Sequence, residues 1–254
     1  MKELIYRLVD TVTGGKGLKK TINGFPVKLP TRYVNYFPTD YETDNFNFLK
    51  RYVKPGDQVL DIGAHIGLFA VSAAQLAGKN GKIYAFEPAS ETQQLLRQTI
   101  AINNMQDVIQ PYEAAVGSHT GKITFYVSDI KGDNSNSLVS YKDDRKLNAK
   151  EVDIFRIDDF VQQKQVRNLS FIKIDVEGAE YDALCGAIHT LKTAKPVCIV
   201  AIHPEPIAAK GDSLEKIYDL IAGCGYNIYY DQQLISRESF CSNKELIDLH
   251  IIPA

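Results

Sequence analysis

The feature that most constrains the fold is an apolar run that leads directly into a glycine-bearing turn. Residues 59–67 read VLDIGAHIG, and an apolar, alanine-rich stretch follows them. Glycine has no Cβ, so it lets the chain turn tightly and lets a ligand approach the backbone closely. We therefore predict a strand, a turn and a helix, with the turn at the carboxyl edge of a parallel sheet, where such folds bind ligands.

Short apolar runs and helix-like stretches alternate along most of the chain, and this alternation favours an α/β fold whose sheet is mainly parallel. Ser90 is the expected N-cap of one helix. The last two expected strands, Tyr226–Tyr230 and Leu246–Ile252, have no predicted helix between them, so they are expected to pair as a hairpin with one reversed strand. The other expected strands are Gln58–Ile62, Lys82–Glu87, Val108–Val116, Leu169–Asp175 and Pro196–His203, and the expected helices are Gly67–Leu76, Ser90–Asn103, Gly178–Leu191 and Ser213–Ala222.

Residues 1–53 are predicted to form a small N-terminal appendage, and residues 54–254 the ligand-binding domain. The appendage is expected to contain a helix, a hairpin and a second helix. These are Lys2–Val12, a turn at Asn23 and Gly24, and Tyr41–Tyr52. Between Gly117 and Asn168 the alternation is lost, and the pattern predicts strands over Lys122–Val127 and Glu151–Ile157 and a polar loop over Asp129–Ser137.

Composition excludes several function classes. The formal net charge is −2, from 29 basic and 31 acidic residues with no dense basic stripe, so nucleic acid is not expected as the main partner. The four cysteines are scattered without a CxxC pair, which argues against a zinc site or disulfides and favours a cytoplasmic location. No apolar run approaches the roughly 20 residues of a membrane span. The oligomeric state stays open.

The glycine loop indicates which cofactor it suits. The G-x-G-x-x-G spacing of a dinucleotide site is absent, and the Asp61 carboxylate would repel a pyrophosphate. S-adenosylmethionine has no phosphate and carries an ammonium and a sulfonium, so an acidic residue beside the loop suits it. Glu87 ends the next expected strand, where a carboxylate can accept hydrogen bonds from both ribose hydroxyls.

Residues 172–180, IKIDVEGAE, bring three carboxylates to a strand end and to the start of a helix. The helix macrodipole favours acidic groups in a first turn by about 0.3–1 kcal/mol each, which accounts for Glu180 as well as a functional role would. Asp175 is expected at the strand tip, facing the same cleft as Asp61. We therefore predict functional roles for Asp175 and Glu177.

His203 ends the following expected strand and has the ordinary pKa for taking a proton near neutral pH, although a histidine at a strand end is as often structural. His65, inside the glycine loop, is expected to contact the cofactor rather than to act chemically. A variant in which Asp175, Glu177 and His203 bind a divalent ion such as Mg²⁺ is not favoured, because strand-end carboxylates also cluster without metal.

Together these residues resemble the FkbM-type methyltransferase family over roughly residues 55–205. The motifs are VLDIGAHIG, YAFEP, the AAVG stretch at 114–117 and FIKIDVEGAE. The resemblance implies a Rossmann-like class I methyltransferase sheet, S-adenosylmethionine as cofactor, and O-methylation, often of sugars or secondary metabolites. His65 departs from an Asn common in the family, and Ala201 from a Glu that often precedes the histidine.

We therefore expect some of these residues to bind the cofactor and the others to bind a small-molecule acceptor. The loop carrying Asp61, Gly63, His65 and Gly67 holds the methionine end, Glu87 the ribose, and Glu113 and Ala114 border the adenine. Asp175 lies near the transferred methyl, and Glu177 or His203 accepts or orients the hydroxyl proton. Two alternatives stay open: a dinucleotide-dependent oxidoreductase, and a non-catalytic module that keeps only the cofactor pocket.

Overall fold

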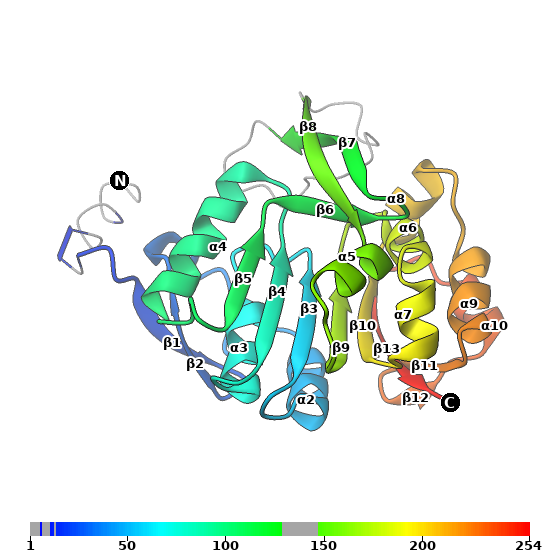
Figure 1. Cartoon of the computed structure of the whole chain (residues 1–254), viewed down its shortest axis with the longest axis horizontal. Coiled ribbons are helices and arrows are strands. Elements are labelled where there is room, and N and C mark those ends of the chain that lie inside the picture. Colours follow the sequence, from blue (N-terminus) through cyan, green and yellow to red (C-terminus); the bar gives the residue numbers. More distant parts are fainter. Residues whose placement is uncertain (1–5, 7–10, 13, 129–146) are drawn as a thin grey trace.

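An eight-stranded sheet forms the centre of the computed structural model, which describes residues 6, 11–12, 14–128 and 147–254 (Figure 1). Its strand order is β12-β11-β13-β10-β9-β3-β4-β5. Five neighbouring strands pair in parallel, which confirms the sheet predicted from the alternation. They are β3 (Gln58–Ile62), β4 (Lys82–Phe86), β5 (Ile109–Tyr112), β9 (Leu169–Ile174) and β10 (Val197–Ile202).

The reversed strand expected near the C-terminus is β13 (Ile247–Pro253). It lies antiparallel between β10 and β11 (Tyr226–Tyr230). The connection from β11 to β13 is not a simple hairpin, because it contains β12 (Gln233–Leu234), which is antiparallel to β11, and the helix α10 (Arg237–Cys241). Such short elements carry too few residues to show a hydrophobic period, so the sequence pattern does not reveal them.

Helices cover both faces of the main sheet, and the strand side chains alternate between two buried apolar clusters. Val59 packs in one cluster and Leu60 in the other, so Asp61 points to the same face as Val59. The Val59 face is covered by β1 (Leu18–Ile22), β2 (Phe25–Leu29), α2 (Thr43–Tyr52), α3 (Leu68–Ala77) and α4 (Ser90–Ile102). The opposite face is covered by α5 (Ile157–Gln163), α6 (Glu180–Cys185), α7 (Ile188–Thr193), α8 (Pro204–Ala209) and α9 (Leu214–Gly223).

The N-terminal segments pack into the apolar cluster that contains Val59, where β2 contacts α3 and α4, and α2 contacts β13. The predicted hairpin is confirmed, since Ile22 pairs with Phe25 and the turn residues Asn23 and Gly24 have φ of 47° and 84°. The second predicted helix is α2. A boundary at residue 53 stays a prediction, although the N-terminal part shares the apolar cluster that contains Val59. The predicted helix Lys2–Val12 lies almost entirely outside the described residues, and so does the loop Asp129–Ser137.

The prediction of one strand over Val108–Val116 was wrong. The chain breaks at Glu113 into β5 and β6 (Ala114–Gly117), which belong to different sheets. Pro111 has no backbone N–H, so it suits the edge position that β5 occupies and does not donate to a further strand. The second sheet has the order β6-β8-β7 and continues with β7 (Gly121–Ser128) and β8 (Leu147–Arg156).

The prediction of one helix over Gly178–Leu191 was also wrong. α6 ends at Cys185 and α7 begins at Ile188. A Cβ at Gly186 would overlap the carbonyl oxygen of Gly117 in β6, so the two backbones touch where the helix breaks. Two further differences are the unpredicted helices α5 and α8, and the N-cap of α4, which is Ala89 rather than Ser90.

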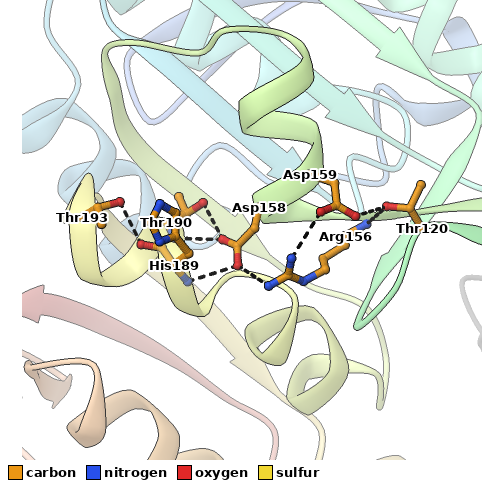
Figure 2. Close-up of polar contacts among 7 residues, drawn as sticks. All are labelled: Thr120, Arg156, Asp158, Asp159, His189, Thr190 and Thr193. Carbon is orange, nitrogen blue, oxygen red and sulfur yellow. Dashed lines mark hydrogen bonds and ion pairs between the residues drawn. The ribbon is translucent and has the colours of Figure 1, made fainter.

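A buried aspartate in the first turn of α5 holds the start of α7 (Figure 2). Asp158 accepts hydrogen bonds from the backbone N–H groups of His189 at 3.1 Å and Thr190 at 2.8 Å, and from the Thr190 hydroxyl at 2.7 Å. Arg156 donates to it at 2.7 Å. Asp158 therefore satisfies N–H groups that a helix leaves unpaired at its start, and it joins two helices on this face.

Candidate active site

A pocket opens at the carboxyl edge of the parallel strands, on the face that carries Asp61. The ends of β3, β4 and β9 form its floor, β6 and β7 contribute one side, and the segment before α2 contributes another. Its empty space, counted together with the part open to solvent, is about 1120 Å³. Its polar lining comprises Tyr41, Glu42, Asp61, His65, Glu87, Thr92, Lys173, Asp175 and Glu177.

The glycine loop after β3 lies directly against the end of β9. Gly63 has φ +80°, and a Cβ there would overlap the carbonyl oxygen of Asp175. The Gly63 N–H donates to the carbonyl of Phe86 at 3.0 Å, which ties the loop to β4 as well. Gly67, at φ +90°, lies against Leu96 of α4. Both glycines are therefore required by backbone geometry and close contact, as the sequence predicted.

His65 has φ +50°, a left-handed conformation in which Asn and His are enriched among non-glycine residues. This explains physically how His65 replaces the Asn common in the family. Its ring lies 6.1 Å from the ring of Tyr33, 6.2 Å from Tyr36 and 6.4 Å from Phe37. The histidine thus connects the glycine loop to these three aromatic residues, of which Phe37 lines the pocket.

Asp61 carries a buried carboxylate at the pocket wall. It is 0% exposed, and neither oxygen has a hydrogen-bond partner of good geometry among the described residues, although the backbone N–H of Ala70 lies close enough to lower its pKa. Burial raises the pKa of Asp61 to about 6, while the positive charge of Lys173 opposes that shift. A buried carboxylate without a partner is costly, so this position suits a ligand that brings a positive charge or a hydrogen-bond donor.

Glu87 is also buried and stands at the end of β4. It accepts hydrogen bonds from the backbone N–H groups of His65 at 3.1 Å and Ala89 at 3.0 Å. Burial raises the pKa of Glu87 to about 7, and the two N–H donors limit that shift. The carboxylate therefore holds the glycine loop in place while it lines the pocket.

Lys173 is the main pocket residue absent from the predicted site. Its ammonium lies 2.8 Å from Asp175 Oδ2 and 5.7 Å from the ring centre of Phe69. Burial disfavours its charge, but Asp175, Glu42 and Asp61 outweigh burial and raise the pKa of Lys173. The signal that could have identified it is a lysine inside an otherwise apolar strand, which requires an acidic partner once buried.

Asp175 is at the predicted strand tip, and its side chain is 33% exposed. Burial raises its pKa, but Lys173 and His203 more than offset that and hold it below the ordinary value. His203 Nε2 lies 3.8 Å from Asp175 Oδ1. His203 itself does not line the pocket, so it reaches the pocket through Asp175.

Glu180 fixes the other side of the His203 ring. Its Oε1 lies 2.7 Å from His203 Nδ1 and accepts the Gly178 N–H at 3.0 Å, and its side chain is 0% exposed. Burial lowers the pKa of His203, but the hydrogen bond and charge of Glu180 outweigh burial and raise it. Glu180 therefore contacts a candidate catalytic residue, which its place in a helix's first turn did not reveal.

The three remaining predicted residues do not all line the pocket. Glu177 lines the pocket with φ +46°, and Ala114 lines it from β6. Glu113 does not line the pocket and instead accepts a hydrogen bond from the Ser90 hydroxyl at 2.6 Å. Glu113 lies between β5 and β6, where the chain passes from one sheet to the other.

Within residues 6, 11–12, 14–128 and 147–254, no group of three or more His, Cys, Asp or Glu side chains is arranged to hold a metal ion. Within those ranges, no helix is both long enough and apolar enough to cross a bilayer.

The chain is similar in sequence to known methyltransferases. A family model described as the methyltransferase FkbM domain matches residues 61–228, more than half of the chain. The 2-O-methyltransferase NoeI of Sinorhizobium fredii is 28% identical over 54% of this chain and 60% of its own length. The hexuronic acid methyltransferase AglP of Haloferax volcanii is 25% identical over 64% of this chain and 62% of its own length.

The chain therefore spans about three fifths of the length of these relatives. Among solved structures, the methyltransferase FkbM from Methylobacillus flagellatus superposes with a TM-score of 0.48 and 16% identity, over 82% of this chain and 51% of that one.

Proposed function

Because the chain belongs to the FkbM methyltransferase domain family, we propose that it transfers a methyl group from S-adenosyl-L-methionine to a hydroxyl oxygen of a small acceptor. The observation that carries this proposal is the acidic pocket at the carboxyl edge, with the buried, unpartnered carboxylate of Asp61 in its wall. The name of one relative, a 2-O-methyltransferase, supports an oxygen as the methylated atom, and the name of the other, a hexuronic acid methyltransferase, supports a sugar-derived acceptor.

The residues present fit this cofactor. Asp61 and the loop from Gly63 to Gly67 would hold the methionine end, where the ammonium finds an acidic wall and the glycines allow close approach. Glu87 would accept hydrogen bonds from the ribose hydroxyls, and Ala114 would border the adenine. When bound, the cofactor supplies an activated methyl group on a sulfonium, so the chain's own task is mainly to align the acceptor.

Asp175, Glu177 and His203 are the proposed acceptor-side residues. Asp175 has a lowered pKa and is therefore a weak base, which suits a group that orients the acceptor hydroxyl. The hydroxyl proton leaves to Glu177, which lines the pocket, or by way of Asp175 to His203, which does not line the pocket but has a raised pKa. Glu180 would hold the His203 ring so that Nε2 faces Asp175.

The function is tested with methyl-labelled S-adenosylmethionine and a panel of hydroxylated small molecules. We expect label transfer to an oxygen, and a Glu87→Ala variant is expected to bind S-adenosylhomocysteine at least tenfold more weakly, the loss of about one charge-assisted hydrogen bond. Cofactor binding without transfer to any acceptor would favour a non-catalytic module. Binding of NAD in place of S-adenosylmethionine would favour an oxidoreductase.

The proton acceptor is tested by pH–rate profiles of Glu177→Gln and His203→Gln. The rate of the unchanged protein is expected to rise with pH as the base loses its proton, and the variant that removes the base loses this rise. The reaction is proposed to need no divalent ion, and a loss of activity with a chelator would contradict this. Four free cysteines at Cys185, Cys198, Cys224 and Cys241 support the proposed cytoplasmic location.

A further inference from the structure

Two buried side chains of opposite charge stand on neighbouring strands at the deep end of the pocket. Asp61 of β3 and Lys173 of β9 are partners in the parallel register, so their side chains share one face of the sheet. They are 0% and 6% exposed, and both line the pocket. Neighbouring strands lie about 4.8 Å apart, so a carboxylate and an ammonium are presented side by side.

Both groups have hydrogen-bonding capacity left over within the described part of the chain. Neither oxygen of Asp61 has a partner of good geometry there. The Lys173 ammonium has three N–H donors, and its hydrogen bond to Asp175 Oδ2, at 2.8 Å, uses one of them. Buried polar groups are nearly always hydrogen-bonded, so this pair suits a ligand that brings both a donor and an acceptor.

Aromatic rings of two helices close this end of the pocket. Phe46 of α2 and Phe69 of α3 line it, are 1% and 5% exposed, and have ring centres 6.0 Å apart. The Lys173 ammonium lies 5.7 Å from the ring centre of Phe69. Asp175, the proposed acceptor-side residue, follows Lys173 by two positions and stands at the strand tip. Asp61 and Lys173 therefore lie deeper than the acceptor side.

The start of α2 is held in place beside Lys173. Asn45 is 2% exposed and donates to Glu42 Oε2 at 3.2 Å and to Asp248 Oδ2 at 2.8 Å. Burial disfavours the charge of Lys173, but the surrounding carboxylates, Glu42 among them, outweigh burial and raise its pKa. Lys173 is therefore a cationic hydrogen-bond donor at neutral pH.

We propose that Lys173 donates a hydrogen bond to the carboxylate of the methionine end of S-adenosylmethionine, while Asp61 accepts one from the ammonium on the same carbon. This inference rests on the proposed function and assigns it a further cofactor-binding residue. The two charges of an α-amino acid are only about 2.5 Å apart, so they require an acidic and a basic partner on adjacent positions. Asp61 and Lys173 satisfy this requirement, whereas a simple cation or anion would use only one of them.

The test compares S-adenosylmethionine with its decarboxylated form, which keeps the ammonium and the sulfonium but lacks the carboxylate. Calorimetry measures the affinity of both ligands for the unchanged protein, Lys173→Met, Asp61→Asn and the control Lys79→Met, which removes an exposed lysine outside the pocket. We expect the unchanged protein to bind the decarboxylated form at least tenfold more weakly, the loss of about one charge-assisted hydrogen bond. In Lys173→Met this ratio should fall to about one. Asp61→Asn should weaken the binding of both ligands, and Lys79→Met of neither.

The sign of the effect is informative, because the carboxylates beside Lys173 favour added positive charge. Without a contact to Lys173, loss of the ligand carboxylate would strengthen binding. Equal or tighter binding of the decarboxylated form by the unchanged protein would therefore overturn recognition of the carboxylate.

An unchanged ratio in folded Lys173→Met would overturn the role of Lys173, and so would a ratio that falls only in Asp61→Asn. If Lys173→Met does not fold, Lys173→Gln, which keeps a donor for Asp175, takes its place in the same comparison. Binding of neither ligand by the folded, unchanged protein would contradict the proposed function itself.

Discussion

Replacing Gly63 by alanine is expected to damage both the fold and the pocket. At φ +80°, a residue with a Cβ is disfavoured by roughly 1–2 kcal/mol. The new methyl would also overlap the carbonyl oxygen of Asp175, and moving a packed backbone aside costs roughly 1–3 kcal/mol more. The expected loss in the free energy of unfolding is therefore roughly 2–5 kcal/mol.

The chain offers a matched control in Gly56, which has φ +89° and nothing within 4 Å of an added Cβ. Gly56→Ala should therefore show only the backbone cost, roughly 1–2 kcal/mol. Urea unfolding gives both free energies, and calorimetry gives the affinity for S-adenosylhomocysteine, which should fall at least tenfold in Gly63→Ala because Asp175 must shift. If the two variants lose equal stability and bind equally well, the loop does not depend on that contact.

Three other predictions concern the charges. The affinity for S-adenosylmethionine should fall as the pH drops from 8 to 5.5. The pKa values of Glu87 and Asp61 are about 7 and about 6, so protonation in this range removes negative charges that stabilise the positively charged cofactor. An affinity that calorimetry shows to be independent of pH would contradict this. Glu180→Gln should lower the pKa of His203, measured by NMR titration of the ring, and an unchanged titration would remove Glu180 from its positioning role. Asp158→Ala should lower the free energy of unfolding by roughly 2–4 kcal/mol, because it leaves the Thr190 N–H and hydroxyl without an acceptor. The affinity for S-adenosylhomocysteine should stay unchanged, and weaker binding would show that Asp158 also affects the pocket.

The predicted site residues meet where the ends of adjacent parallel strands lie side by side. Asp61, Glu87 and Asp175 each end a strand of one parallel sheet, so the alternation of strands and helices was sufficient to predict that they meet. Glu113 does not join these residues, because the chain breaks there and does not continue as the single strand that the pattern predicted. The chain leaves the main sheet at that residue, and a local hydrophobic pattern does not indicate to which sheet a strand belongs.

The residues that sequence reasoning missed depend on partners far away in the chain. The Asn45 amide donates a hydrogen bond to Asp248 Oδ2 at 2.8 Å, although the two residues are 203 positions apart and nothing near either residue indicates that they meet. Glu180 had a sufficient local explanation in the helix macrodipole, which concealed its contact with His203. Lys173 was visible as a charge within an apolar strand, but its role depends on acids from neighbouring elements.

Three pocket residues that are not glycine share an unusual backbone conformation. Glu42, His65 and Glu177 have φ of 45°, 50° and 46° and come from three separate segments. Each positive φ lowers the free energy of unfolding by roughly 1–2 kcal/mol, so the shape of the pocket is maintained at a cost in stability. Selection for thermal stability alone would therefore favour glycine or asparagine at these three positions. It would thereby remove three side chains that line the pocket.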